Sequence, residues 1–515
     1  MRSVAIFCVL TVAVAQTLAA QAERHAHGAH GTGLGEVTFA NTGAPAAQEP
    51  FLRGLALLHS FEYEEAAESF RAAQQADAKF AMAYWGEALT YAHLLWGEDD
   101  AAGARRALAR LAPAADGRLA RAGSARERAY GAAVEALFAE TDAATRVRAF
   151  ADSMRQVVAQ YPDDADAVAF AALALMFKEY VGRLPADQRS AARAEAIALA
   201  ERVFRSHPRH PGSTHYLIHA TDDPAHAARG LAAAQSYARL APEAEHALHM
   251  PSHIFLQLGM WPDVVASNER AWAASRAEVV TRKLSNADLS FHTLQWLQYG
   301  YLQQGRYRAS QAIIDTARTV LANVDLSNPL HVDARFTVHW LEFMQAAHTG
   351  DWPANVCRRA SQPASVTTAS SDRERSFQSI AQYQAAVAAA LCGAAGAPAL
   401  QSLRAVEAIP PNDPALPILR TAQLHADAIA AYGRGEYARA IELLQPAAAE
   451  PARPPVGPPP GLRVHELLAA ALLKAGRTQE AAAAYERALQ LTPNRSLALL
   501  GLARARAAAG QRAGA

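Results

Sequence analysis

The sequence is poor in features that point to a reaction or to a charged partner. Its 515 residues include 49 Lys and Arg against 49 Asp and Glu, without a long basic stretch. Bulk electrostatic attraction to nucleic acid or to an anionic membrane is therefore not expected. The signatures of serine hydrolases, phosphate-binding loops and dinucleotide-binding folds are missing. His465-Glu466 is followed by Leu-Leu-Ala and so lacks the second histidine of a zinc-protease helix. We predict no catalytic residue.

Long hydrophobic runs are also scarce, and the one at the N-terminus is short. Arg2 precedes an apolar run over residues 4–15, and the Ala-Gln-Ala of residues 20–22 is a small-x-small cleavage pattern. This arrangement predicts a signal peptide over residues 1–22. The run is too short to cross a bilayer as a helix. We expect an exported, periplasmic protein with no integral membrane segment after signal removal; an uncleaved N-terminal anchor is the alternative.

Cysteine is rare, with three residues in the whole chain. Cys8 lies inside the predicted signal peptide, which leaves Cys357 and Cys392, 35 residues apart on what look like neighbouring helices. Their spacing matches no zinc motif. Export makes a disulfide chemically possible, but two separately buried thiols fit the sequence equally well.

Composition divides the rest of the chain into four parts. Residues 23–48 are rich in His, Gly and Ala and are predicted to be a flexible leader. Residues 49–445 are predicted to be a helical array. Residues 446–461 are Pro-rich and should interrupt it as an extended loop, serving as a spacer or as a ligand for a Pro-binding domain. Residues 462–509 are predicted to form a last repeat and a capping helix.

Within the array, small and large apolar residues recur at fixed positions of a repeat. In the first repeat Gly54 and Ala66 fall at positions 8 and 20, and Leu57 and Phe70 fall at positions 11 and 24. The equivalent residues near the C-terminus, with a proline at position 32, are Ala469, Leu472, Ala481, Tyr485 and Pro493. Small residues let the two helices of a repeat approach closely, large ones fill the space between repeats, and proline ends the second helix.

This pattern resembles the tetratricopeptide repeat (TPR) family, whose unit is a helix–turn–helix of 34 residues. The resemblance implies an all-α solenoid of the TPR type, a right-handed superhelix with a few loop insertions. In such arrays the first helix of each repeat lines a concave groove with its positions 2, 5, 9, 12 and 13.

A narrower resemblance covers about half of the chain, from Phe51 to about Gly305. Its phrases are the segments LLHSFEYEEAAESF, AMAYWGEALTYAHLLWG, HPGSTHYLIHATDDPAHA and HALHMPSHIFLQLGMW. They are similar to a bacterial subgroup of exported TPR proteins without a known activity. The resemblance implies the same fold and the same histidine-lined site, but no substrate or reaction.

Two pairs of histidines lie one repeat apart at groove positions 5 and 9. His215 and His219 form the first pair, and His249 and His253 form the second pair 34 residues later. Residues four apart share a helix face, and packed helices lie about 8–10 Å apart, so the four imidazoles are expected on one surface. Such a set would suit zinc or copper. Histidines that hydrogen-bond a peptide or a neighbouring loop are the alternative, and direct catalysis is a third.

Other groove residues accompany these pairs. His246 and His292 fall at position 2 and His93 at position 13, while Trp96 and Tyr216 lie outside the packing positions; all five are predicted to line the ligand groove. Acidic residues close in sequence are expected to orient the imidazole N–H groups: Asp222, Asp223, Glu243 and Glu245. Asp222 or Asp223 is also a natural cap for a helix beginning at Pro224, which is favoured over a catalytic carboxylate pair.

These observations predict a binding or scaffold module of the cell envelope, whose groove takes a protein or peptide partner. The first alternative is a metal-binding or metal-handling protein that uses the two histidine pairs. The second is a metal-dependent enzyme.

Overall fold

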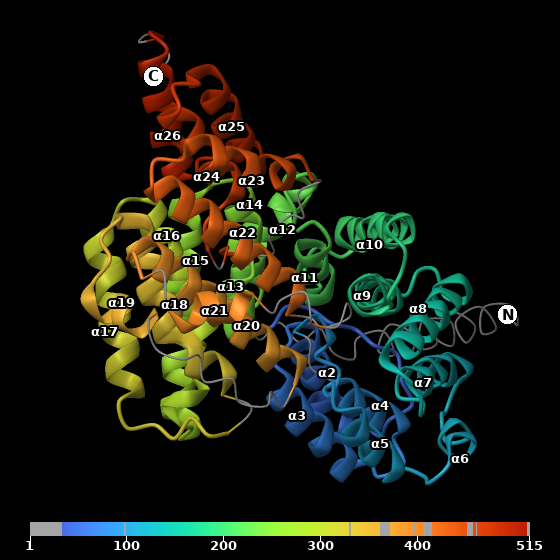
Figure 1. Ribbon diagram of the computed structural model, residues 1–515. Helices are drawn as coiled ribbons and strands as arrows, with labels where there is room; N and C mark the ends of the chain where they lie inside the picture. The colour runs from blue at the N-terminus through green and yellow to red at the C-terminus, as the bar shows by residue number, and fades with distance from the viewer. Residues whose placement is uncertain are drawn as a thin grey trace, which may run out of the picture. The chain divides into compact units, whose positions relative to one another are not determined.

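The computed structural model describes residues 33–96, 99–328, 331–360, 371–394, 397–404, 409, 415–450, 457–459 and 461–511. Every regular element in these residues is a helix (Figure 1), which confirms the predicted all-α class. None of these helices is both long and apolar enough to span a membrane. The predicted signal peptide, residues 1–22, and the first part of the predicted leader lie outside the described residues.

The chain forms two compact units. The first consists of Met1–Ala220 and Arg239–His246, and the second of Thr221–Ala238 and Ala247–Ala515.

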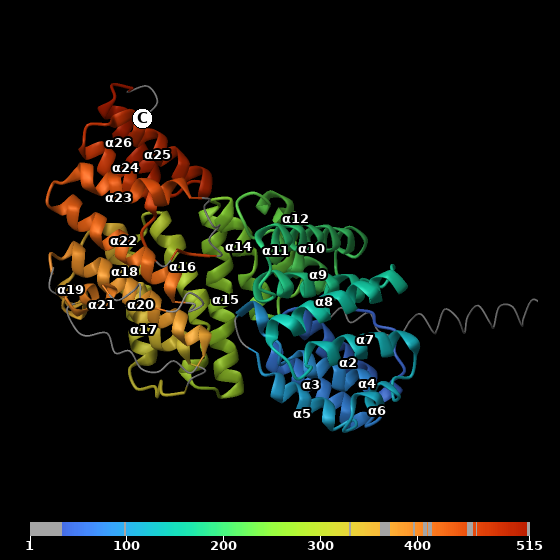
Figure 2. The ribbon, with the colours of Figure 1, turned by 45° about the vertical axis from the view of Figure 1, so that its right-hand side comes forward.

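The helices of the first unit pack in sequential pairs. Figure 2 shows α7 to α10 as neighbours in such a series. The elements are α2 (Pro45–His59), α3 (Tyr63–Ala76), α4 (Ala81–Leu89), η1 (Leu94–Trp96), α5 (Ala101–Ala109), α6 (Ala115–Leu119), α7 (Ala125–Leu137), α8 (Ala143–Gln160), α9 (Ala165–Val181), α10 (Ala186–Ser206) and α11 (Pro211–Ala220).

The first helix pair shows why the repeat positions carry small residues. A Cβ atom at Gly54 of α2 would lie 3.0 Å from the ring of Phe70 on α3. Phe70 is fully buried, as is Ala66 at position 20. The close approach of α2 and α3 therefore depends on the glycine, as the repeat pattern predicted.

The prediction of a flexible leader over residues 23–48 is wrong for its second half. Leu34, Val37 and Phe39 are buried in the first unit, and the amide of Glu36 donates to the carbonyl of Arg209 at 2.8 Å. α2 already begins at Pro45. The reason is that three apolar side chains within six residues bury enough surface to hold the segment. The Gly- and Ala-rich composition had suggested that no such surface would be buried.

The second unit continues the series of helices. α12 (Ala227–Leu240) and α13 (Glu245–His249) each have residues in both units. The others are α14 (Pro251–Gln257), α15 (Trp261–Arg282), η2 (Asn286–Asp288), α16 (Phe291–Gln303), α17 (Tyr307–Leu321), α18 (Val332–Thr349), α19 (Ala354–Ala360), α20 (Asp372–Leu391), α21 (Pro398–Leu403), α22 (Leu416–Gly433), α23 (Tyr437–Ala449), α24 (Val464–Lys474), α25 (Thr478–Leu491) and α26 (Ser496–Ala508).

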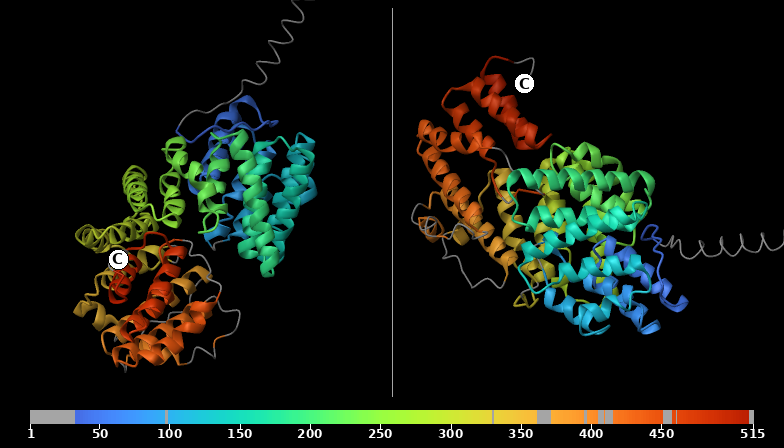
Figure 3. Two further views of the ribbon diagram at one scale, coloured as in Figure 1. Left: turned by 90° about the horizontal axis from the view of Figure 1, so that it is seen from above. Right: turned by 90° about the vertical axis from the view of Figure 1, so that its right-hand side faces the viewer.

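The last helices of the second unit lie side by side (red in Figure 3). They also contact earlier helices of the same unit. The indole N–H of Trp261 donates to the carbonyl of Asn494 at 2.7 Å, across 233 residues of sequence. Arg495 is buried, pairs with Glu466 and donates to the hydroxyl of Tyr299. The unit is thus held by contacts between distant repeats as well as between neighbours.

The Pro-rich segment differs from the extended loop predicted for residues 446–461. Pro446 lies inside α23, which runs on to Ala449 because alanine favours helix. Further on, Gly457 and Pro459 are buried, and a Cβ atom at Gly457 would lie 2.7 Å from the ring of Trp296. The described end of the segment is therefore packed against the second unit.

The structure resolves the cysteine alternatives in favour of a disulfide. Cys357 of α19 is bonded to Cys392, which follows α20, with a Cα–Cα distance of 5.9 Å. The bond joins two neighbouring helices of the second unit.

Candidate functional site

Three histidines of the second unit converge. His249 ends α13, His253 lies in α14 after Pro251, and His292 lies in the first turn of α16. Each offers a ring nitrogen, and these three atoms all lie within 4.8 Å of one another. His249 and His253 are buried and His292 is exposed. The group combines positions 5 and 9 of one repeat with position 2 of the next.

The Nδ1 atoms of the two buried histidines are held by hydrogen-bond acceptors. Nδ1 of His249 lies 2.7 Å from Oδ1 of Asn268, whose own amide nitrogen donates to the carbonyl of Val264 at 2.7 Å. Nδ1 of His253 lies 2.6 Å from a carboxylate oxygen of Asp222. Both Nδ1 atoms are therefore protonated donors. As predicted for Asp222, a carboxylate orients the ring of a candidate ligand.

The Nε2 atoms of His249 and His253 face each other, and in the neutral rings both are acceptors. They lie 3.2 Å apart. In neutral rings whose Nδ1 atoms carry the proton, both Nε2 atoms present a lone pair, and two lone pairs repel at this distance. A cation between them removes the repulsion. Two nitrogens bound at about 2.0–2.1 Å to a tetrahedral zinc ion are about 3.4 Å apart, close to the spacing seen here.

Burial keeps His249 in the form that binds metal. The pKa of His249 is held well below its usual value, first by burial and then by the neighbouring His292 and His253. A neutral imidazole is the species that coordinates a metal ion. Trp296 closes one side, with its ring centroid 4.4 Å from that of His253.

The first unit contains a second group of three histidines at the same repeat positions. His215 and His219 of α11 and His246 of α13 place three ring nitrogens within 4.8 Å of one another. His215 is fully buried and the other two are half-buried. Nδ1 of His215 donates to the carbonyl of His59 at 2.7 Å, which leaves Nε2 as its lone-pair nitrogen in the neutral ring.

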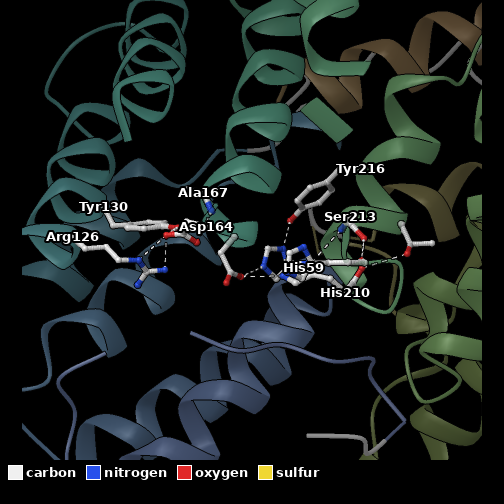
Figure 4. Close-up of polar contacts among 11 residues, drawn as sticks. His59, Arg126, Tyr130, Asp164, Ala167, His210, Ser213 and Tyr216 are labelled. Atoms are coloured by element: carbon white, nitrogen blue, oxygen red, sulfur yellow. Dashed lines mark hydrogen bonds and ion pairs between the residues drawn. The ribbon is translucent and has the colours of Figure 1, made fainter. Parts of the chain in front are cut away.

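A third group, His59, Asp166 and His210, uses its ring nitrogens differently (Figure 4). The Nε2–H groups of His59 and His210 donate to one carboxylate oxygen of Asp166, at 2.9 and 3.2 Å. Nδ1 of His59 accepts from the hydroxyl of Tyr216 at 3.0 Å, and Nδ1 of His210 accepts from the amide of Ser213 at 3.2 Å. All four ring nitrogens are used, so the group is a buried hydrogen-bond network and not a metal centre.

Electrostatics and packing agree with that assignment. Burial lowers the pKa of His59 to about 4, against the smaller opposing effect of its hydrogen bond to Asp166. Burial alone would raise the pKa of Asp166, but its hydrogen bonds from His210 and His59 outweigh this, and the pKa falls below the usual range. A Cβ atom at Gly212 would lie 2.3 Å from Nδ1 of His59, so a glycine is needed there.

The structure revises several site predictions. The two predicted pairs belong to different units. His246 converges on His215 and His219, and His292 converges on His249 and His253. The four predicted ligands are thus divided between two centres of three histidines each. Three of the four predicted metal ligands are buried instead of exposed, namely His215, His249 and His253. The cause is that bulky neighbours, such as Trp296, cover groove positions that the repeat pattern leaves open to solvent.

Among the aromatic predictions, Tyr216 does not line a groove. It is fully buried, and its hydroxyl serves His59. His93 is half-buried, stacks on Tyr63 at 4.0 Å and lies 2.7 Å through Nε2 from the carbonyl of Thr90. Trp96 is 36% exposed, and its place in a ligand groove stays a prediction.

Sequence reasoning missed residues that hold the ligands in place. Asn268 lies within α15, and His59 and Asp166 lie far from the histidine pairs in the chain. Nothing in their local sequence marks them. By contrast, Asp223 behaves as a capping residue, because its carboxylate accepts the amides of Ala225 and His226, although α12 begins only at Ala227.

The helix pairs and their repeat positions define a TPR-type helical repeat protein with histidine centres. Residues 462–495 match the model of the tetratricopeptide repeat, where the sequence predicts the last repeat, and this match confirms the predicted resemblance to that family. A comparison with curated proteins finds no match.

Two solved structures share a general likeness with this chain. The human IFIT1 dimer with m7Gppp-AAAA is 13% identical over 92% of this chain and 89% of that chain, with a TM-score of 0.33. The TPR domain of P58(IPK) is 12% identical over 90% of this chain and 98% of that chain, with a TM-score of 0.19. With TM-scores this low, neither structure supports an argument about function.

Repeats of this kind bind proteins through extended surfaces. A protein-binding scaffold role is therefore supported at that general level.

Proposed function

We propose that this protein is an exported TPR scaffold that binds a divalent transition-metal ion, zinc or copper, through His249, His253 and His292. The observation that carries the proposal is the 3.2 Å approach of the Nε2 atoms of His249 and His253, whose Nδ1 atoms are both committed to other acceptors. Imidazole nitrogens suit zinc and copper, and a carboxylate behind one ligand is typical of zinc centres.

The residues around the centre fit such an ion. Asp222 fixes the ring of His253 and is itself held by the side-chain amide of Gln257 at 2.9 Å. Asn268 fixes the ring of His249. Three protein nitrogens leave a fourth coordination position for water or for a group of a bound partner. We propose that a protein or peptide is this partner, which joins the metal centre to the scaffold role.

The proposal that the protein is exported rests on two features of the chain. The N-terminal sequence has the composition of a signal peptide. The disulfide between Cys357 and Cys392 supports an oxidising compartment such as the periplasm, because such bonds are rare in the reducing cytosol.

The metal proposal is tested on the full-length protein without a histidine tag. The chelated protein is titrated with Zn²⁺, and the number of tightly bound ions and their affinity are measured by calorimetry. The double variant His249→Gln/His253→Gln should lose one ion per chain. His207→Gln is the matched control, since His207 is exposed and its ring contacts the neighbouring Ser206. Unchanged zinc stoichiometry in the double variant would refute the proposal.

A further inference from the structure

The histidine group of the first unit repeats the design of the second. In both, positions 5 and 9 of one repeat meet position 2 of the next, and three ring nitrogens lie within 4.8 Å. In both, Nδ1 of the position-5 histidine is held by an acceptor oxygen: the carbonyl of His59 for His215 and Oδ1 of Asn268 for His249. The acceptors differ in kind and come from unrelated parts of the sequence, so the shared orientation is not inherited from one local motif.

A rigid network positions His215. The carbonyl that accepts its Nδ1–H belongs to His59, whose ring is fixed between Asp166 and Tyr216. All four residues are nearly fully buried. The lone pair on Nε2 of His215 is thereby directed by a buried hydrogen-bond network, as expected of a preorganised ligand.

The third ligand is held from the other side. The backbone amide of His246 donates to a carboxylate oxygen of Glu62 at 3.0 Å. Glu62 directly precedes α3 and directly follows Phe61. The turn over residues 59–62 thus supplies both the carbonyl that orients His215 and the carboxylate that anchors His246.

Phe61 in this turn faces all three imidazoles. Its ring centroid lies 4.4 Å from that of His215 and 5.6 Å from those of His219 and His246. The residue adopts a φ of +60°, a left-handed conformation that is unfavourable for a bulky side chain and that concentrates at functional sites. Trp96 adds a second wall, with its ring 5.6 Å from that of His246.

We infer that His215, His219 and His246 form a second transition-metal site, separate from the centre of the second unit and walled by Phe61 and Trp96. The site takes a zinc or copper ion through three imidazole nitrogens. It stands on its own geometry and does not need the centre of His249 and His253 to be occupied.

The test counts ions in four forms of the tag-free, full-length protein. The parent should bind two zinc ions per chain. His219→Gln/His246→Gln should bind one, His249→Gln/His253→Gln should bind one, and the quadruple variant none. His219 and His246 are chosen because they are half-buried, whereas His215 is fully buried and its replacement risks the fold. His207→Gln should again leave both ions in place.

A second measurement leaves the three proposed ligands of the new site in place. In the His249→Gln/His253→Gln protein, Cu²⁺ bound in the first unit should quench the fluorescence of the nearby Trp96. Adding Trp96→Phe should remove that part of the quenching while one ion is still bound.

The outcomes separate the two proposals. If His249→Gln/His253→Gln binds no ion, the second site does not exist, while the centre of the second unit stands. If only His219→Gln/His246→Gln removes an ion, the second site stands and the centre of the second unit falls. If the parent binds an ion that neither double variant removes, the inference is overturned. It is also overturned if Cu²⁺ bound to the His249→Gln/His253→Gln protein leaves Trp96 unquenched.

Discussion

At the residue scale, the three histidine groups show that residue type alone does not define a metal centre. His59 and His210 use both ring nitrogens in hydrogen bonds within the protein, and their group is complete without an ion. His249 and His253 hold Nδ1 against acceptor oxygens and direct Nε2 at each other. Whether Nδ1 donates or accepts a hydrogen bond therefore decides whether Nε2 of a neutral ring keeps the lone pair that a cation needs.

The carboxylate behind His253 provides a first prediction. Asp222→Asn removes the negative charge that supports the Nδ1–H of this ligand, so we expect zinc affinity at this centre to fall by about 10- to 100-fold. Asp223→Asn is the control, because the neighbouring carboxylate accepts the amides of Ala225 and His226. Competition titration with a zinc chelator measures both variants. Equal affinities for Asp222→Asn and the parent would contradict the prediction.

His348 provides a prediction about pH. Its Nδ1–H donates to the carbonyl of Met344, and its Nε2 accepts from Gln303, both at 3.0 Å. Burial, with a further contribution from Arg495, lowers its pKa to about 3. The unfolded state, with a pKa near 6.5, then binds more protons than the native state between about pH 3 and 6.5. Stability is full above pH 6.5 and falls as the pH decreases.

The measurement is urea unfolding at pH 7 and pH 4.5. Acidification should lower the free energy of unfolding of the parent by on the order of 2–3 kcal/mol more than that of His348→Gln, whose side chain stays neutral. The comparison is made without metal, so that ligand protonation does not contribute. Parallel losses in the two proteins would show that His348 does not resist protonation.

At the scale of the element, the sequence predicted the helix pairs and their phase because these depend on local spacing. Gly54 and Phe70 meet between α2 and α3 as positions 8 and 24 require. The segment before α2 was not predicted. Its apolar residues are few and their partners, such as Trp85 and Tyr130, lie far along the chain.

Phe39→Ala tests how much this segment contributes. Phe39 is 5% exposed and its ring lies 5.5 Å from that of Phe51. Truncation leaves a cavity among aromatic rings and should lower the free energy of unfolding by about 3–5 kcal/mol. Glu36→Ala, which removes an exposed ion pair with Arg209, should cost about 1 kcal/mol or less. A small loss for Phe39→Ala, measured by urea denaturation, would mean that the segment is only loosely held.

The candidate site was predictable in part for the same reason. Spacing on one helix face identified the histidine pairs, and repeat phase placed His246 and His292 at equivalent positions. Spacing does not report burial, nor which residue satisfies Nδ1. Those properties depend on Asn268, His59 and Asp222, which reach the rings from other elements.

At the scale of the whole molecule, bonds between distant parts of the chain restrain the second unit. The hydrogen bond from Trp261 to the carbonyl of Asn494 ties α15 to the last repeat. Such contacts join residues far apart in sequence, which no local pattern encodes. They tie the last repeat to earlier helices of the same unit.

The disulfide is the covalent member of these restraints, and its removal gives the last prediction. Cys357 and Cys392 close a loop of 35 residues that contains most of α19 and α20. Because closing such a loop reduces the entropy of the unfolded chain, replacing both cysteines with alanine should lower the free energy of unfolding by roughly 3–4 kcal/mol. The parent treated with a reductant should lose the same amount, while the double variant should not respond to reductant.

The same bond links stability to the cell compartment. Protein directed to the periplasm should contain no free thiol by mass spectrometry after alkylation, whereas protein retained in the reducing cytosol should contain two, apart from Cys8 of the signal segment. Cytosolic protein should then unfold at lower urea concentration until it is oxidised. If cytosolic and periplasmic protein unfold alike while differing in thiol content, the disulfide is not a stabilising restraint, and its support for export would be correspondingly reduced.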